Sequence, residues 1–162
     1  KIEEDMNKID IEMKNSEFKK LFLHTINNQD NPFHPLVWIN GSPVIGEETY
    51  IGGFSEINAK GAKVVIGKKC DIASFVAINV ADSHRRCIGL DNTNTNRDIK
   101  IGDFVFIGTH CAILGGASIG HHSVIAAGSI IRSVKIAPFS LVIGNEIKSG
   151  YYKAEYEANK NK

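Results

Sequence analysis

The sequence lacks the features that mark several large classes of protein. Its 162 residues include three cysteines, an odd number without the paired spacing of a zinc site. Its 19 Lys and Arg residues nearly balance its 18 Asp and Glu residues, so no basic field is present to neutralise nucleic-acid phosphates. No apolar run approaches the roughly 20 residues that a membrane span needs, and the charged N-terminal segment does not resemble a signal peptide. These absences predict a reduced, cytoplasmic, single-domain protein.

What the sequence has is a strict spacing of isoleucine. The residues recur every six positions within three groups: Ile45, Ile51 and Ile57; Ile66, Ile72 and Ile78; Ile101, Ile107, Ile113, Ile119, Ile125 and Ile131. A strand has a period of two and a helix a period of 3.6, so neither element generates this pattern. A repeat of fixed length is instead typical of stacked architectures.

Two further positions share the period of six. Glycine often follows the isoleucine directly, as in Gly46, Gly52 and Gly108, and a compact residue such as Ser55 or Cys70 stands four places after it. We interpret each unit as one short strand and one corner, with isoleucine and the compact residue facing inward. Three units then form one 18-residue turn of a triangular coil, whose turns stack at the spacing of paired strands, roughly 4.8 Å.

The segments IGEETYIGGFSEI, IGKKCDIASFVAI and IGDFVFIGTHCAILGGASIGHHSVIAAGSII resemble the hexapeptide-repeat acyltransferases. The resemblance covers about residues 41–147 and implies an all-β fold, a left-handed parallel β-helix. It also implies a homotrimer with active sites at the subunit interfaces. The hand of the coil is an implication of the resemblance, since the spacing alone does not fix it.

The repeat is interrupted twice, each time after the third face of the coil. Three residues are inserted between Ile57 and Ile66, and 17 between Ile78 and Ile101. Both insertions therefore project from one side of the prism. Asn58 and Asn79 each follow an isoleucine of this face, so we expect them to lie near each other beneath the long loop, 79–100.

The long loop is similar to the histidine-bearing loop of the galactoside and maltose O-acetyltransferases and the xenobiotic acetyltransferases. The match in FVAINVADSH places the general base on His84, and Asn58 matches the family's active-site asparagine. Histidine suits this role because its ordinary pKa, about 6.5, lies near neutral pH. The loop lacks the proline that follows the catalytic histidine in the sugar enzymes, which puts the subfamily in doubt. Asn79, Arg85 and Arg86 are expected to bind the acceptor, although a solvated loop would also explain the two arginines.

The resemblance further implies that acetyl-CoA binds along the C-terminal coils, between two subunits of the trimer. Thr109, Ala127 and Gly128 are the matching positions for the pantetheine arm, although simple corner geometry also explains the latter two. Three cations are candidates for the cofactor phosphates, with a solvated surface as the alternative: Arg132, Lys135 and Lys148. No metal is expected to be required.

Several functional hypotheses stay open beside acetyl transfer to a sugar hydroxyl. His84 could equally serve as the base for N-acylation of a nucleotide-linked amino sugar. His110 is a rival base. It is the fourth residue of its six-residue unit, a position that should face outward, so it could instead border a subunit interface or the cofactor. A gamma-carbonic-anhydrase-like zinc enzyme is disfavoured because His110 and His122 are 12 residues apart and should lie on different faces. A non-catalytic β-helix that only assembles with partners is the remaining class.

The two ends do not follow the repeat. Residues 1–40 are expected to form a helical cap over the open end of the β-helix, where unpaired strand edges would invite aggregation. Trp38 is expected to pack on the first coil, with acceptor contact as the alternative. Residues 148–162 are expected to form a short polar helix or a frayed tail.

Overall fold

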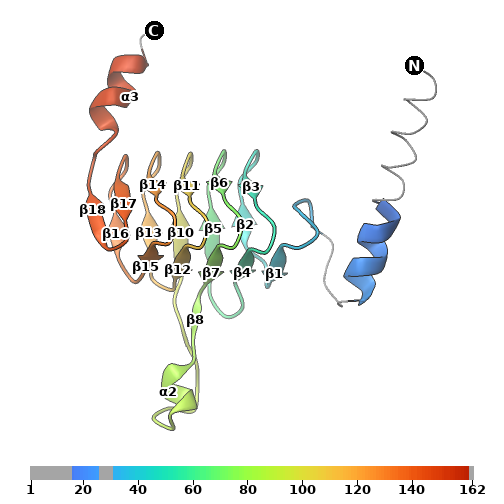
Figure 1. Ribbon diagram of the computed structural model, residues 1–162. Helices are drawn as coiled ribbons and strands as arrows, with labels where there is room; N and C mark the ends of the chain where they lie inside the picture. Colours follow the sequence, from blue (N-terminus) through green and yellow to red (C-terminus); the bar gives the residue numbers. More distant parts are fainter. Residues whose placement is uncertain (1–15, 26–30, 161–162) are drawn as a thin grey trace, which may run out of the picture.

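In the computed structural model, which describes residues 16–25 and 31–160, the coils form a triangular prism of three parallel sheets (Figure 1). We name the sheets A, B and C. Sheet A contains, in spatial order, β1 (Trp38–Asn40), β4 (Glu56–Asn58), β7 (Ala77–Asn79), β12 (Ala112–Leu114) and β15 (Ile130–Ile131). Each complete coil contributes one strand to each wall of the prism.

The other two walls repeat this order. Sheet B contains β2 (Val44–Ile45), β5 (Val64–Ile66), β10 (Ile99–Ile101), β13 (Ser118–Ile119) and β16 (Lys135–Ile136). Sheet C contains β3 (Tyr50–Ile51), β6 (Asp71–Ile72), β11 (Phe106–Ile107), β14 (Val124–Ile125), β17 (Leu141–Ile143) and β18 (Glu146–Lys148). Up to β17, successive strands of the coils thus lie on different walls, and hydrogen-bonded neighbours come from successive coils. The last strand, β18, instead folds back on β17 in antiparallel fashion.

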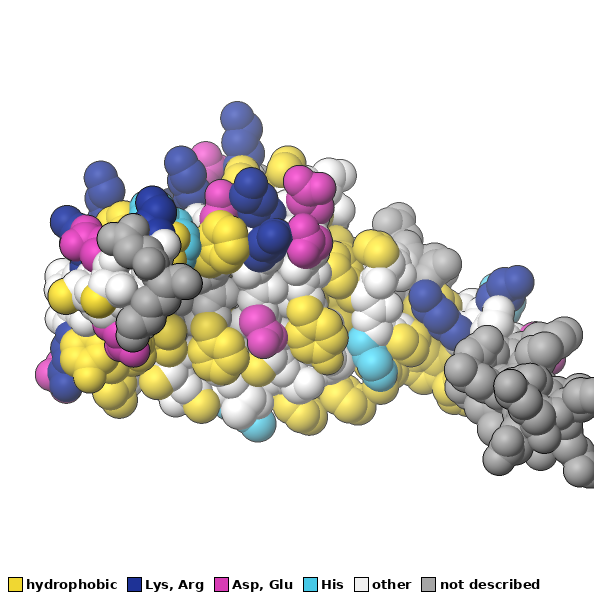
Figure 2. Space-filling model, turned by 90° about the horizontal axis from the view of Figure 1, so that it is seen from above, with side chains coloured by type: hydrophobic (Ala, Val, Ile, Leu, Met, Phe, Trp, Pro, Cys, Tyr) yellow, Lys and Arg dark blue, Asp and Glu magenta, His cyan; other side chains and the backbone are white. Residues whose placement is uncertain are grey.

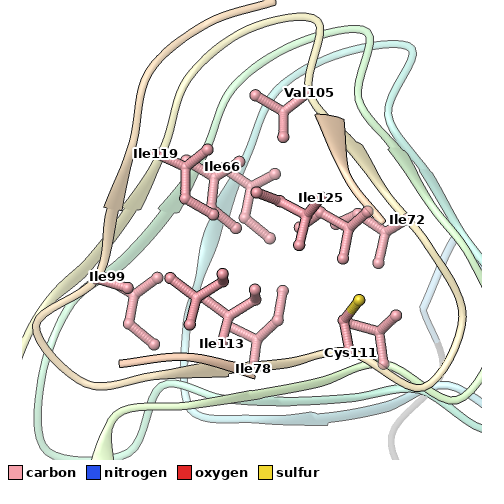
Figure 3. Close-up of a cluster of buried hydrophobic side chains, with 14 of the residues drawn as sticks. Ile66, Ile72, Ile78, Ile99, Val105, Cys111, Ile113, Ile119 and Ile125 are labelled. Atoms are coloured by element: carbon pink, nitrogen blue, oxygen red, sulfur yellow. The ribbon is translucent and has the colours of Figure 1, made fainter. Parts of the chain in front are cut away.

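The strand register confirms the predicted stacking of isoleucine on isoleucine. Ile66 pairs with Ile45 and Ile101 in sheet B, and Ile57 pairs with Ile78 in sheet A. These side chains point into the centre of the triangular section, where they form one continuous core (Figure 3). The inserted residues therefore leave the pairing intact, because each is absorbed at a corner.

The compact residues of the repeat are buried, as predicted. Cys70 and Cys111 are each 2% exposed, and Ser55 is 1% exposed. Their side chains also connect coils: Ser55 Oγ donates to the carbonyl of Ala73 at 3.1 Å and accepts the N–H of Val76 at 3.1 Å. A polar atom in this position is tolerated because it is hydrogen-bonded on both sides.

Where glycine follows the isoleucine of a unit, the close approach of the next coil requires it. A Cβ added to Gly108 would stand 2.6 Å from the amide nitrogen of Ala127, and one added to Gly46 would stand 2.4 Å from that of Lys68. The left-handed conformation of the corners falls on a different position, two residues later, where it is often adopted by phenylalanine or histidine, as in Phe104 (φ 56°). Glycine therefore acts here through its missing side chain more than through its backbone freedom.

The coils extend further at both ends than the isoleucine spacing indicated. At the N-terminal end, β1 pairs with β4, so Trp38 starts a strand within the segment expected to be a helical cap. At the C-terminal end, β16 and β17 continue sheets B and C, although Ile136 follows Ile131 by five residues instead of six. One residue is missing from that corner, and the register of the walls survives.

The segments outside the coils are short. Residues 16–25 are helical, and the rest of the predicted helical segment lies outside the described residues. At the other end, α3 (Lys153–Asn159) confirms the predicted polar helix. None of the described helices is both long and apolar enough to cross a membrane.

Candidate functional site

The 17-residue insertion forms an arm that projects from the corner between sheets A and B (Figure 1). Its two stems, β8 (Ala81–Asp82) and β9 (Thr95–Asn96), pair in antiparallel fashion, and its tip contains the helical turn α2 (His84–Cys87). The arm therefore has a defined conformation of its own, and its first stem leads directly into the helical turn.

His84 stands where the first stem meets the helical turn, and a carboxylate holds its ring. The distance between His84 Nδ1 and Asp82 Oδ1 is 2.5 Å, and the same oxygen accepts the backbone N–H of His84 at 3.1 Å. The hydrogen bond from the His84 side chain, reinforced by that from its backbone, lowers the pKa of Asp82. An ionised carboxylate can only accept, so Nδ1 carries the hydrogen and Nε2 of the neutral ring is left as the basic atom.

Asp82 is a further candidate residue of this site, which the sequence alone did not indicate. The signal was the spacing Asp-Ser-His, which allows a side chain to bend back to a ring two residues away. The side chain of His84 is 66% exposed and that of Asp82 is 42% exposed, so the pair is accessible to a substrate.

Asn58 and Asn79 lie together at the foot of the arm, as predicted. They are register partners in sheet A, and Asn58 Nδ2 donates to Asn79 Oδ1 at 3.1 Å. Each side chain also fixes its own turn, since Asn58 Oδ1 accepts the N–H of Lys60 and Asn79 Oδ1 accepts that of Ala81. The two asparagines therefore position the start of both insertions.

The shorter insertion braces the longer one. The backbone N–H of Lys63 donates to Asp98 Oδ1 at 2.9 Å, and the N–H of Ile99 donates to the carbonyl of Lys63 at 2.9 Å. Gly61 lies so close to Asn96 that an added Cβ would stand 2.5 Å from the amide nitrogen of that side chain. The two interruptions of the repeat thus form one local structure.

The arginines expected to bind the acceptor belong to the arm tip. Arg85 Nε is 3.8 Å from Asp91 Oδ2, and Arg86 Nε donates to Asn94 Oδ1 at 2.8 Å. Both contacts lie within the arm itself. In this conformation the arginines stabilise the loop, and their role toward an acceptor stays a prediction.

The residues predicted for the pantetheine arm gather at the corner between sheets C and A. Gly128 donates its N–H to the carbonyl of Thr109 at 2.9 Å, and Ala127 approaches Gly108 on the coil before it. All three are exposed, and no atom lies within 4 Å of the position that a Gly128 Cβ would occupy. This corner therefore has open space beside its backbone.

The three predicted phosphate-binding cations lie elsewhere on the prism. Arg132 follows β15 at the corner between sheets A and B, Lys135 lies on β16 of sheet B, and Lys148 lies on β18 of sheet C. One protomer therefore does not bring these cations together. Only Arg132 shares a corner with the arm.

His110 and His122 lie on different corners, as their spacing indicated. His110 stacks on Phe75 at 5.0 Å, whereas His122 stacks between Phe104 and Phe139 at 4.6 and 5.0 Å. Burial lowers the pKa of His122, and the neighbouring His121 lowers it further. Both histidines therefore belong to aromatic columns that run along the coils.

Comparison with known proteins agrees with this architecture. The bacterial transferase hexapeptide model, of six repeats, matches residues 98–133. The chain is 31% identical over 133 residues to the bifunctional protein GlmU of Staphylococcus haemolyticus, covering 72% of this chain and 29% of that protein. The chain spans less than half the length of the curated relatives that it matches.

Solved structures with more than 25% identity are also similar to this chain. The polySia-specific acetyltransferase NeuO is 31% identical with a TM-score of 0.55, covering 67% of this chain and 52% of that one. Galactoside acetyltransferase in complex with coenzyme A is 26% identical with a TM-score of 0.58, covering 80% and 65% respectively. These findings confirm the resemblance to the hexapeptide-repeat acyltransferases.

Proposed function

We propose that this hexapeptide-repeat protein is an acetyl-CoA-dependent acetyltransferase that modifies a hydroxyl of a sugar or sugar-like acceptor, with His84 as its general base. The observation that carries the proposal is the 2.5 Å contact between His84 Nδ1 and Asp82 Oδ1. This contact leaves Nε2 of His84 as the proton-accepting atom. Asn58 and Asn79 hold the base of the arm that carries this histidine.

In this proposal the pair supplies the general base of a direct transfer. Nε2 of His84 removes the proton from the acceptor hydroxyl as that oxygen attacks the thioester carbonyl. The carbon–sulfur bond then breaks, and coenzyme A leaves as the thiol once its sulfur has received the proton held by His84. Asp82 stabilises the imidazolium form of the ring during the transfer. Asn58 and Asn79 are proposed to act near the acceptor, at the foot of the arm.

Acetyl-CoA is proposed to lie along the corner formed by Thr109, Ala127 and Gly128. The open space beside Gly128 supports this placement. Because glycine has no side chain, an extended pantetheine chain can approach its backbone closely. The solved galactoside acetyltransferase, 26% identical, contains coenzyme A. Of the three cations predicted for the cofactor phosphates, Lys135 and Lys148 are kept in this role, because Arg132 lies at the base of the arm. No metal is part of the proposal.

A homotrimer would bring these elements together. The arm leaves the corner between sheets A and B, whereas Thr109 and Gly128 occupy the corner between sheets C and A. A complete site therefore requires the arm of one protomer and the coils of another. Exposed hydrophobic residues cluster around the second corner: Tyr50, Phe54, Phe75, Phe106 and Ile130. Figure 2 shows such side chains following one another along the body, and surfaces of this kind mark protein interfaces.

The test is release of coenzyme A thiol from acetyl-CoA across a panel of neutral sugars, acidic sugars and nucleotide-linked amino sugars. His84→Ala should reduce turnover by about 10²-fold or more, the usual contribution of a general base. His24→Ala, in the helical residues 16–25, is the matched control and should leave turnover unchanged. Sedimentation should give the mass of a trimer.

Other outcomes select other functions. Turnover only with amino sugars would indicate N-acylation. Turnover that survives His84→Ala would move the base to His110. If acetyl-CoA neither binds nor reacts, the enzyme proposal fails, and zinc binding or partner assembly becomes the question. A stable monomer would contradict the shared site.

A further inference from the structure

A cavity of about 310 Å³ lies at the base of the arm, on the side of the later coils. Its apolar lining includes Val80 and Leu114. The residues of its lining that have polar side chains are one acid, one serine and two arginines: Asp82, Ser133, Arg97 and Arg132. Asp82 is also hydrogen-bonded to His84, so the cavity lies beside the proposed base.

The cavity walls are fixed by backbone contacts. The N–H of Arg97 donates to the carbonyl of Val80 at 3.1 Å, which joins the two stems where they leave the prism. A Cβ added to Gly115 would stand 2.7 Å from the carbonyl oxygen of Val80 and 3.2 Å from that of Arg97. The arm therefore sits directly on the coil that contains Gly115, and this contact sets the position of Arg97.

The charges in the cavity do not cancel. Two arginines and one aspartate line it, and the carboxylate of that aspartate already accepts hydrogen bonds from His84. Within residues 16–25 and 31–160, neither Arg97 nor Arg132 forms an ion pair within 4.0 Å or a side-chain hydrogen bond, although the charge of Arg97 helps to lower the pKa of Asp82. The arginines of the arm tip differ, because Arg85 and Arg86 are both engaged inside the arm.

We propose that Arg97 and Arg132 bind an anionic group of the acetyl acceptor, a carboxylate or a phosphate, and so hold the acceptor beside His84. Guanidinium groups bind both anions through paired hydrogen bonds. The proposal deepens the proposed function, on which it rests, by making the acceptor an acidic sugar or a sugar phosphate. The phosphates of coenzyme A are the other source of the same chemistry. We assign the cavity to the acceptor because it adjoins the base, whereas those phosphates are separated from the thioester by the whole pantetheine chain.

The experiment compares acceptors that differ in one charge. Sialic acid methyl glycoside is paired with its methyl ester, and glucose 6-phosphate with glucose, in the thiol-release assay. The wild type should prefer the charged member by about 10- to 100-fold in kcat/KM, the scale of a charge-assisted hydrogen bond. Arg97→Gln and Arg132→Gln should each lose most of this preference while the KM for acetyl-CoA stays unchanged.

Two further variants make the result specific. Lys69→Gln removes a cation at the opposite corner, where Lys69 pairs with Glu48 at 3.6 Å, and it should keep the preference. Arg97→Lys retains the charge without the planar fork and should restore part of the preference, which a merely structural role for Arg97 would not explain. Thermal unfolding establishes that each variant is folded.

The outcomes separate the two proposals. Equal use of charged and neutral acceptors by the wild type would overturn the acceptor assignment. A raised KM for acetyl-CoA with the preference intact would also overturn it, in favour of the coenzyme phosphates. If no acceptor reacts, the proposed function fails. The anion site then still stands if inorganic phosphate raises the unfolding temperature of the wild type but not of Arg97→Gln, and it falls if phosphate has no effect on either.

Discussion

Asp82 and His84 form a hydrogen-bonded pair in which one carboxylate oxygen contacts both the ring Nδ1, at 2.5 Å, and the backbone N–H, at 3.1 Å, of the same histidine. Two contacts to one residue fix the ring relative to its own backbone. The arm thus carries its own orienting group, which does not depend on the coils beneath it.

Replacing this carboxylate should slow the chemical step. Asp82→Asn keeps the shape but can no longer stabilise the imidazolium, so kcat should fall by about 10- to 10⁴-fold, the upper figure being the effect of the same change in a serine-protease triad. The pH–rate profile should change with it, whereas the KM for acetyl-CoA should not. Asp91→Asn, which alters the arm tip instead, is the control. An unchanged kcat in Asp82→Asn would show that the pair has no catalytic role.

The glycines that follow isoleucine should be far more sensitive than glycines at open corners. In Gly108→Ala the new Cβ would meet the backbone of Ala127 at 2.6 Å, and neither backbone can move without separating two coils. We expect a loss of about 3 kcal/mol or more in the free energy of unfolding.

Gly144→Ala provides the comparison, because nothing lies within 4 Å of its added Cβ. Its cost comes only from the positive φ of 58° and should be about 1–2 kcal/mol. Denaturant unfolding measures both variants. Equal losses would mean that the approach of successive coils does not explain the glycine pattern.

Ser55 should be replaceable by cysteine more easily than by alanine. Ser55→Ala leaves the buried N–H of Val76 without its partner, which should cost about 1–3 kcal/mol. Cysteine occupies the equivalent position in two other coils, where Sγ of Cys70 and of Cys111 each contacts a carbonyl at 3.2 Å. Ser55→Cys should therefore lose less stability than Ser55→Ala. The reverse order in chemical denaturation would contradict this account of the compact position.

His122 should make stability depend on pH. Burial lowers its pKa from the ordinary 6.5, so the unfolded chain binds this proton more readily than the folded one. Linkage then requires the free energy of unfolding to fall as pH drops below 6.5, and to be unaffected by this residue well above that pH. Unfolding temperatures measured across this range test the sign.

His122→Phe is the matched variant, because phenylalanine occupies the same position on both neighbouring coils, Phe104 and Phe139, which stack on the ring. It keeps the aromatic column, including its edge contact with Tyr156 of α3, and removes the titrating group. The decline toward low pH should be shallower than in the wild type. Parallel curves for the two proteins would assign the pH dependence to other groups.

The sequence was informative wherever one period controlled many residues. Eighteen-residue turns place Ile125 over Ile107, and a three-residue insertion at a corner leaves Ile66 in register with Ile45. The same counting predicted the pairing of Asn58 with Asn79. It failed at Ile136, where one residue is missing, because a pattern based on spacing stops at the first change of spacing even though hydrogen bonding between coils continues.

The repeat by itself thus determined the core, the three walls and the side from which the arm projects, because stacked coils force equivalent residues into contact. The tertiary structure decided the path of the arm. That path brings Arg97 from the returning stem and Arg132 from a later coil to one cavity with Asp82, and it confines Arg85 and Arg86 to the arm tip. No period relates these residues. Their meeting depends on how a 17-residue insertion folds back on the coil that contains Gly115, a contact between unlike segments that residue spacing does not encode.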